Sequence, residues 1–295
     1  MRKVSVIIVN FNTKAILLDC VKNLQKSYYK NLEIIVVDNG SADGSYEALK
    51  EKFPEVKAIK SENIGLAAGS NLGYKNSTGD YLLYLGSDAF PEENAITGLI
   101  DYFEANNDIG VATCKLVLRD NTIDMDAHRG FPTPWAAMTH FSKLNRIFPK
   151  SRVFNQYFLG WKNMDVPHEI DLCISHFMMI PRKVLEKVGL WDENFFVFGE
   201  DVDMCYRIKL AGYKIMYLPE WKTIHYKGVS VGIRKESQDL SNSTKETRLK
   251  MSKERTTAMK LFYKKHYSKK YPSFITGFVL FGINFLEKIR LAQTR

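Results

Sequence analysis

Hydrophobic and polar positions alternate regularly along the first 120 residues. Two apolar runs, Val4–Val9 and Leu32–Val37, are rich in β-branched residues, as expected of strands buried on both faces of a sheet. Between them, Ile16–Leu24 carries its apolar residues at the spacing of an amphipathic helix. The same patterns predict further strands at Val56–Ile59, Tyr81–Leu85 and Val111–Val117, and further helices that end near Phe53 and span Leu66–Lys75 and Glu92–Asn106.

Strands that alternate with helical stretches of this length indicate an α/β fold, with a Rossmann-like, mostly parallel sheet and helices on both faces. The pattern breaks at residues 119–170, which hold four prolines and many aromatic residues without a clear period. We therefore expect an irregular segment there. Regularity returns with an apolar run at Ile174–Ile180, helices at Arg182–Val188 and Asp201–Ala211, and a strand at Lys214–Leu218.

The composition is that of an ordinary globular protein. Hydrophobic residues make up 45% and charged residues 25% of the 295 positions, which excludes a disordered or collagen-like chain. The four cysteines are scattered without a C-x-x-C pair, so we expect neither a disulfide framework nor a zinc ribbon. A reducing cytosol is the simplest setting for such a chain, and the first residues offer too short an apolar run for a signal peptide.

The net charge of +9 comes from the end of the chain. Residues 231–295 hold 15 Lys and Arg against 5 Asp and Glu, so the preceding residues are close to neutral. Within this basic segment, Phe274–Leu286 is uncharged but shorter than the roughly 20 apolar residues that cross a bilayer. Basic residues beside an apolar aromatic stretch favour an anionic membrane surface. The alternative is a helix packed on the rest of the chain or on a second copy, which leaves a homo-oligomer open.

Polar residues directly follow three of the predicted strands. They are Asn10, with Phe11 beside it, then Asp38, and then the pair Ser87 and Asp88. Each alone is better explained as a turn or capping residue. In an open α/β sheet, however, ligands bind outside the carboxyl ends of the strands, so three polar groups at one edge predict a site.

Two familiar phosphate-binding motifs are missing after the first strand. The sequence has neither G-x-G-x-x-G nor G-x-x-x-x-G-K-[ST] there, which disfavours a dehydrogenase and a P-loop ATPase. Further along, Gly65, Gly69 and Gly73 recur every four residues and form a bare helical stripe that favours close packing. Asn63 and Gly65 precede that helix, where backbone N–H groups can bind an anion.

Three carboxylates, Glu200, Asp201 and Asp203, cluster where a helix is predicted to begin. Acidic residues at that position complement the helix dipole, which is a purely structural explanation. The functional explanation is a general base that the helix N-terminus keeps ionised. His225 follows the last predicted strand, and a lone histidine is more often a structural residue than a ligand.

Several ordered segments resemble the inverting family 2 glycosyltransferases, most of all the rhamnosyltransferase-like branch of bacterial polysaccharide assembly. The resemblance covers about residues 3–230 and implies a GT-A fold, with a nucleotide-sugar half at 1–118, an acceptor half at 119–230 and a basic helical tail at 231–295. The segments that carry it are VSVIIVNFNT, IIVVDNGSADGS, ENIGLAAGSNLG, GDYLLYLGSDAF and GLWDENFFVFGEDVDMCYRIKLAGYKIMYLP, followed by TIHYKGVS.

The resemblance also implies how a nucleotide-sugar would be bound. Asn10 and Phe11 would flank the base, and Asp38 would bond to the edge of a pyrimidine. Asn63 and Gly65 would shape the pocket for the nucleotide and the sugar. These five residues come from the three motifs at the start of the chain.

Metal and catalytic residues follow from the later motifs. Asp88 would bind a divalent metal, Mn²⁺ or Mg²⁺, with His225 as a candidate second ligand, and Ser87 would contact the ribose. Asp201, which follows Glu200, would be the general base. Relatives often carry Asn-Pro-Asp or Asp-x-Asp where this chain has Gly-Ser-Asp, so a second carboxylate is missing and a strict metal requirement is in doubt.

The sequence therefore predicts inverting transfer of a sugar from a nucleotide-diphosphate sugar, with dTDP-rhamnose as the first candidate. The acceptor would be a hydroxyl of a saccharide or a lipid-linked saccharide, at the cytoplasmic face of the cell membrane, and we expect no nucleic-acid partner. Two alternatives stay open. A sugar nucleotidyltransferase would need a Gly-rich basic loop after the first strand, and a nucleic-acid-binding protein would use the basic tail, where lysines alternate with Tyr263, Tyr267 and Tyr271.

Overall fold

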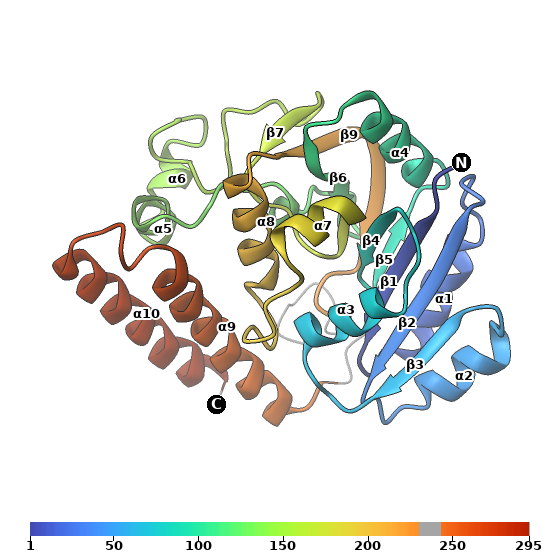
Figure 1. Cartoon of the computed structure of the whole chain (residues 1–295). Coiled ribbons are helices and arrows are strands. Elements are labelled where there is room, and N and C mark those ends of the chain that lie inside the picture. Colours follow the sequence, from blue (N-terminus) through green and yellow to red (C-terminus); the bar gives the residue numbers. More distant parts are fainter. Residues whose placement is uncertain (230–242, 295) are drawn as a thin grey trace.

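The computed structural model describes residues 1–229 and 243–294, and within them one mixed sheet carries helices on both faces (Figure 1). The strands are β1 (Val4–Asn10), β2 (Leu32–Asn39), β3 (Lys57–Ser61), β4 (Tyr81–Leu85), β5 (Ala89–Pro91), β6 (Ile109–Val117), β7 (His168–Ile170), β8 (Phe177–Pro181) and β9 (Lys214–His225). The helices are α1 (Lys14–Leu24), α2 (Ser45–Lys52), α3 (Leu66–Lys75), α4 (Ala95–Ala105), η1 (Met125–Ala127), α5 (Pro134–Phe141), α6 (Leu144–Ile147), α7 (Arg182–Val188), α8 (Glu200–Leu210), α9 (Lys245–His266) and α10 (Ser273–Thr294).

The sheet has the strand order β3-β2-β1-β4-β8-β6-β9-β5, and β7 pairs with β9. The strands β1 to β4 run parallel, as the sequence predicts. In the second half, β8 runs antiparallel between β4 and β6, and β5 and β7 run antiparallel to β9. The sheet is therefore parallel in its first half and mixed in its second, because β8 enters from the opposite direction.

Two apolar clusters form the core on the two faces of the sheet. The helices α1 and α4 pack on one face, and α3, α7 and α8 pack on the other. The bare stripe of α3 allows close approach to β1, because an added Cβ at Gly73 would lie 2.5 Å from Cγ2 of Ile7. A Cβ at Gly69 would lie 2.9 Å from Cγ1 of Val9, so the structure confirms the packing explanation for both glycines.

Residues 119–170 contain only the short elements η1, α5, α6 and β7, in line with their irregular sequence. The later strand at Lys214–Leu218 is longer than predicted and runs through His225. It continues because the register against β6 shifts between Cys114 and Lys115, after which pairing resumes as far as Ile224. His225 consequently belongs to the strand and does not follow it.

The basic segment near the end of the chain forms two long helices. Thr244 caps the first, α9, by accepting a hydrogen bond from the backbone N–H of Thr247 at 3.1 Å. The helices α9 and α10 lie side by side at the edge of the molecule opposite β2 and β3, with α9 against α8 (Figure 1). The contact between α9 and α8 is apolar and aromatic, and it includes Phe195, Tyr206, Ala258, Phe262, Tyr263 and Tyr267.

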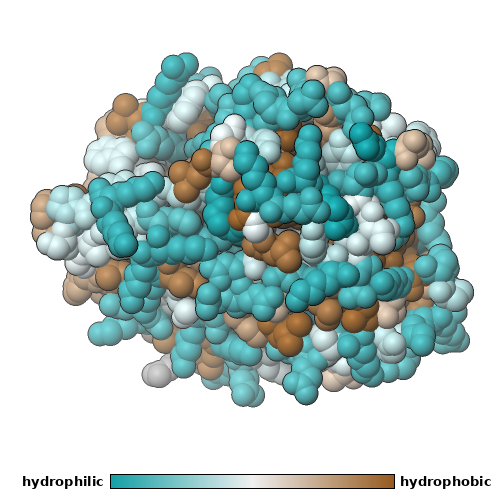
Figure 2. Space-filling model, in the orientation of Figure 1, coloured by the Kyte–Doolittle hydropathy of each residue, from teal (hydrophilic) through white to brown (hydrophobic). Residues whose placement is uncertain are grey.

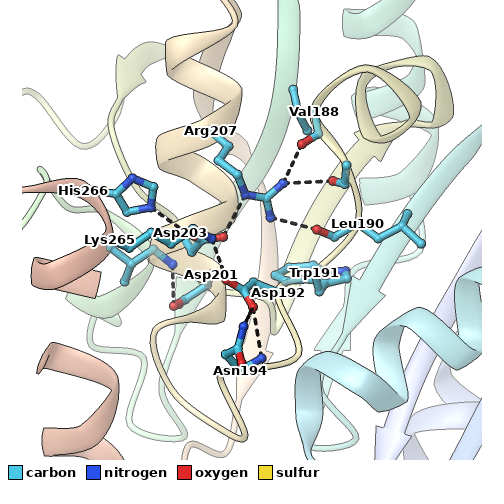
Figure 3. Close-up of polar contacts among 12 residues, drawn as sticks. Val188, Leu190, Trp191, Asp192, Asn194, Asp201, Asp203, Arg207, Lys265 and His266 are labelled. Atoms are coloured by element: carbon cyan, nitrogen blue, oxygen red, sulfur yellow. Dashed lines mark hydrogen bonds and ion pairs between the residues drawn. The ribbon is translucent and has the colours of Figure 1, made fainter. Parts of the chain in front are cut away.

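Asp203 of α8 adds a polar connection to α9 (Figure 3). Its side chain is fully buried and accepts a hydrogen bond from Nε of Arg207 at 2.8 Å on its own helix. From α9, Nζ of Lys265 and Nε2 of His266 each lie 2.7 Å from Oδ1 of Asp203. This carboxylate therefore connects the two helices. The sequence indicates only that it complements the dipole of its own helix.

One face of α10 stays apolar and exposed. Its exposed large side chains are Phe274 (75%), Phe278 (73%), Phe281 (69%), Phe285 (57%) and Ile289 (38%). Elsewhere the surface in Figure 2 is mainly hydrophilic, with smaller hydrophobic patches. Among the described helices, none is both long enough and apolar enough to cross a bilayer, as expected for Phe274–Leu286.

Candidate active site

The mixed half of the sheet brings three segments to one point. After β4 ends, the backbone N–H of Gly86 donates to the carbonyl of His176, which directly precedes β8, at 3.1 Å. The short strand β5 follows Asp88 and pairs with the end of β9, so that Ala89 lies opposite His225. Asp88, His176 and His225 therefore meet although 137 positions of sequence separate the first from the last.

The donor set of these three residues fits a divalent metal. One ligand atom from each residue lies within 4.8 Å of the others. Within the described part of the chain, Nε2 of His225 and Nδ1 of His176 are buried without a hydrogen-bond partner. Two imidazoles and a carboxylate are ligands that first-row divalent metals accept. Desolvation and the neighbouring His225 lower the pKa of His176, which keeps its imidazole neutral, as ligation requires.

A second carboxylate orients His225. Oδ2 of the buried Asp124 lies 2.8 Å from Nδ1 of His225, and this bond leaves Nε2 to face Asp88 at 3.6 Å. Nζ of Lys227 lies 2.5 Å from the other oxygen, Oδ1. Although burial opposes ionisation, hydrogen bonding and charge from His225 and Lys227 hold the pKa of Asp124 well below its usual range. A carboxylate that fixes a ligating histidine is a common outer partner in metal sites.

No sequence pattern marks His176 or Asp124 as functional. The Gly-Ser-Asp motif lacks the second carboxylate, but the imidazole of His176 lies beside this motif. An added Cβ at Gly86 would lie 2.6 Å from Cδ2 of His176 and 2.8 Å from Oδ1 of Asp88, so glycine leaves room for both ligands. The sequence motif shows one carboxylate where relatives carry two, whereas the third candidate ligand, His176, comes from the segment directly before β8.

The carboxylates Glu200 and Asp201 begin α8 and are both buried. Oδ1 of Asp201 accepts the backbone N–H of Val202 at 2.8 Å, and Oδ2 lies 3.6 Å from Nη2 of Arg129. Oε2 of Glu200 is buried without a hydrogen-bond partner among the described residues. Phe198, shortly before this helix, has a φ of 69°, a backbone conformation that residues other than glycine rarely adopt.

Burial raises the pKa of both carboxyls. The Asp201 charge raises the pKa of Glu200 further, whereas Arg129 acts against the rise at Asp201. The sequence predicts that the helix N-terminus keeps Asp201 ionised; in the structure desolvation works against the charged form and Arg129 works for it. The missed residue Arg129 lies in the irregular segment, where no pattern marks it.

One open cavity of about 1480 Å³ joins the metal-type cluster to these carboxylates. Most of the residues that the sequence marks as functional line it, namely Phe11, Asn63, Gly65, Ser87, Asp88, Glu200, Asp201 and His225. Gly65 has a φ of 90°, and a Cβ there would lie 2.5 Å from the carbonyl oxygen of Phe196. The next N–H, from Leu66, donates to that same oxygen at 2.6 Å, so this N–H does not face the solvent-filled space.

Asn10 and Asp38 do not line the cavity, although their neighbours Phe11 and Asn39 do. Asn10 donates to Oγ of Ser41 at 3.1 Å and accepts from Oγ1 of Thr13 at 2.5 Å. Oδ1 of Asp38 accepts the backbone N–H of Ser41 at 2.9 Å, and its Oδ2 is buried without a partner in the described residues. Their contact with a nucleotide stays a prediction.

Comparison with known sequences identifies the relatives of this chain. The family described as Glycosyl transferase family 2 matches residues 5–189. The rhamnosyltransferase WbbL of Escherichia coli K12 is 25% identical over 52% of this chain and 54% of its own length. A cholesterol galactosyltransferase of Borreliella burgdorferi is 26% identical over 84% and 68%. The glycosyltransferase GlyA of Streptococcus pneumoniae is 37% identical over 33% of this chain, which spans only 14% of that protein.

Solved structures share the fold at low sequence identity. The mannosyltransferase PcManGT from Pyrobaculum calidifontis, solved in complex with GDP-Man and Mn²⁺, has a TM-score of 0.58 and 16% identity over 99% of this chain and 73% of its own. GalNAc-T7, solved with UDP, GalNAc and Mn²⁺, has a TM-score of 0.58 and 17% identity over 86% and 48%. These likenesses confirm the GT-A fold, and the sequence match shows that the chain belongs to glycosyl transferase family 2.

Proposed function

We propose that this chain transfers a sugar from a nucleotide-diphosphate sugar to an acceptor hydroxyl, with inversion at the anomeric carbon. The observation that carries the proposal is the single cavity that contains both a metal-type cluster and a pair of buried carboxylates. Neither alternative, a sugar nucleotidyltransferase or a nucleic-acid-binding protein, accounts for this pairing, and the family match does not favour them.

Asp88, His176 and His225 would hold the metal, either Mn²⁺ or Mg²⁺. When bound, the ion supplies positive charge that neutralises the developing charge on the departing diphosphate. PcManGT, which shares this fold, was solved with GDP-Man and Mn²⁺, and this supports a nucleotide-sugar together with a metal here. Phe11, Asn63, Gly65 and Ser87 would contact the nucleotide and the sugar from their places in the cavity wall.

Asp201 would accept the proton of the attacking hydroxyl. Its raised pKa brings this carboxyl closer to neutral pH, where a general base works best, and Arg129 opposes complete loss of its charge. Glu200, whose pKa is also raised, would hold a proton and orient the acceptor through a hydrogen bond. Attack on the face opposite the diphosphate accounts for inversion.

Asp201→Asn tests this assignment. A general base contributes about 10²–10⁴-fold, so we expect turnover to fall by at least that lower factor. Binding of the nucleoside diphosphate should stay at the wild-type value, because the base acts on the acceptor. Glu200→Gln is the matched comparison, and we expect it to lose less turnover. An Asp201→Asn variant that keeps more than about a tenth of wild-type turnover would remove Asp201 from the mechanism.

The donor we propose first is dTDP-rhamnose, and the similarity to rhamnosyltransferase WbbL supports that choice. A panel of nucleotide-sugars compared by thermal shift, with and without Mn²⁺, identifies the donor. A ligand at 100 times its Kd stabilises the folded state by about 2.7 kcal/mol. A larger shift with GDP-mannose or UDP-galactose than with dTDP-rhamnose would replace the rhamnosyl assignment and leave the transferase proposal intact.

We further propose that the chain works at the cytoplasmic face of a membrane, on a saccharide or lipid-linked saccharide acceptor. The exposed face of α10 carries four phenylalanines. Lys264 of α9, Lys269 in the turn between the two helices and Lys288 of α10 are also exposed. An apolar aromatic face with nearby lysines suits the interface of an anionic leaflet, where each cation contributes about 1 kcal/mol.

Flotation with vesicles tests the membrane assignment. The double variant Phe274→Asp with Phe281→Asp should lose binding to anionic vesicles at low salt, because it places two negative charges on the apolar face. Both residues are largely exposed and neither lines the cavity, so the fold and the active site should be unaffected. Leu210→Asp is the matched control, since Leu210 is 66% exposed on another helix. Wild-type protein that stays unbound would defeat the proposal, and a double variant with an altered oligomeric state would indicate a second copy on this face.

A further inference from the structure

The cavity continues from the catalytic carboxylates to the end of the molecule that carries the last two helices. Its lining there comes from residues 132–158, which include α5 and α6, and from residues 247–290, which include most of α9 and α10. These elements lie next to one another on the same side of the structure (Figure 1). We call this part of the cavity the α5–α10 groove, and it belongs to the same cavity as Asp201.

The α5–α10 groove is mainly apolar. Met138 and Phe141 line it from α5 and are 43% and 45% exposed, and Phe285, 57% exposed, lines it from α10. Val279 and Ile283 add to the α10 wall. A bound polysaccharide would leave its hydroxyls without partners along these side chains, which costs free energy, whereas an alkyl chain would be buried favourably.

Gly282 gives the groove room at the centre of α10. It lines the cavity, and an added Cβ would meet no atom within 4 Å. Gly277 on the same helix is also unobstructed but does not line the cavity. The two glycines therefore offer a matched pair, one that faces the groove and one that does not.

The charges in the groove have one sign. Among the described residues that line it from segments 132–158 and 247–290, the charged ones are Arg146, Arg255 and Arg290, with no carboxylate. Arg290 is partly buried, with Nη1 3.7 Å from Sδ of Met259, and desolvation lowers the pKa of its guanidinium. A guanidinium in an apolar wall is well suited to a phosphate group.

We propose that the α5–α10 groove is the acceptor subsite for an amphiphile, with an apolar chain along α10 and a phosphate-type group at Arg290. This inference rests on the proposed transferase function, because the reacting hydroxyl of the amphiphile would then lie toward Asp201. The continuity of the groove with the catalytic end of the cavity and its uniformly positive charge carry the assignment.

The test uses full-length protein and a fluorescent dodecyl phosphate below its critical micelle concentration, followed by anisotropy. Gly282→Trp should weaken binding by at least about tenfold, because loss of roughly two buried methylenes suffices for that factor. Gly277→Trp should leave binding within about twofold of wild type. If Gly282→Trp does not fold, Ala137→Trp fills the groove from the opposite wall. Equal binding by Gly282→Trp and wild type, or no binding by wild type, would overturn the proposal.

The phosphate and the chain are separated by further probes. Arg290→Gln should weaken the dodecyl phosphate by about fivefold or more and leave a neutral dodecyl probe unaffected. Lys288→Gln, on the same helix but outside the cavity, should change neither. Inorganic phosphate alone should bind far more weakly than the amphiphile, and equal affinity would reject the apolar subsite.

Nucleotide binding is measured on the same proteins as an independent readout. All five variants should bind a nucleoside diphosphate with Mn²⁺ as the wild type does, since these substitutions lie away from the metal-type cluster. Failure of nucleotide binding in the wild type would reject the transferase proposal, whereas failure of dodecyl phosphate binding alone would reject the acceptor subsite.

Discussion

Asp203→Asn should uncouple α9 from the catalytic part of the chain. The substitution keeps the size of the side chain and removes the charge that faces Arg207, Lys265 and His266 (Figure 3). The Asp203 carboxylate is fully buried, so ion pairs and hydrogen bonds with these three residues replace the hydration that it loses on folding. Although burial opposes ionisation, hydrogen bonds from His266 and Lys265 and the charge of Arg207 lower the pKa of Asp203 to about 2.

The size of the effect follows from the pKa. A drop from 3.8 to about 2 in the folded state corresponds to about 2 kcal/mol of stability at neutral pH, at 1.36 kcal/mol per pKa unit. Because the folded pKa is the lower one, this contribution is complete above the unfolded value. It is lost as the pH falls through the folded value, and it amounts to about 1 kcal/mol at pH 3.

Urea unfolding of the wild type and the variant, at pH 7 and pH 3, measures both quantities. The difference in unfolding free energy should be about 2 kcal/mol at pH 7 and about half of that at pH 3. Asp108→Asn is the control, because Asp108 pairs with Lys214 at 2.6 Å on the exposed surface, and it should lose far less. A loss at Asp203 that is absent, or equal at the two pH values, would refute the charge argument.

Two further substitutions test the packing and the metal-type cluster. Gly73→Ala should destabilise the fold by about 1–3 kcal/mol in urea unfolding, because the new Cβ would lie 2.5 Å from Ile7, while Gly277→Ala should not; equal stability of the two variants would count against the close packing of α3. Asp124→Asn should weaken Mn²⁺ binding by about 10–100-fold in calorimetry, against no change for the exposed Asp120→Asn, and an unchanged affinity would remove Asp124 as an orienting group.

The first half of the sheet is readable from sequence because its signals are local. The run at Val4–Val9 and the helix beginning near Ile16 depend on β-branched residues and a 3.6-residue period, and both appear in the structure. The insertion of β8 between β4 and β6 is not local, because Met179 pairs with both strands across long stretches of sequence. No periodicity reports which distant strand lies beside which, so the antiparallel half is not predictable from these patterns.

The site shows the same division. Asp88 and Asp201 stand in recognisable motifs, and the cavity brings their segments together. His176 has no partner in the sequence at a metal-binding spacing, and it becomes a candidate ligand only because β8 begins beside the end of β4. Asp124 and Arg129 lie in the segment without a period, so their contacts with His225 and Asp201 could not be foreseen.

The sequence leaves two explanations for Phe274–Leu286, a segment at a membrane surface or a helix packed on the rest of the chain or on a second copy. In the structure this segment lies within α10, which packs along α9, and the aromatic residues of α9, such as Phe262 and Tyr263, are buried against α8. The phenylalanines of α10, such as Phe274 and Phe281, remain exposed, and this is the feature behind the membrane proposal. Sequence patterns do not show which of these aromatic residues become buried, because burial depends on contacts with α8, which is distant in the sequence.

Calorimetric titration with nucleoside diphosphates, with and without Mn²⁺, tests the central claim most directly. The account predicts that wild-type protein binds dTDP, UDP or GDP about tenfold or more tightly when Mn²⁺ is present. Asp88→Asn should bind the same nucleotide with an affinity that Mn²⁺ does not change, whereas Asp201→Asn should respond as the wild type does. An equal response to Mn²⁺ in wild type and Asp88→Asn would contradict a metal-assisted nucleotide-sugar site at Asp88, His176 and His225.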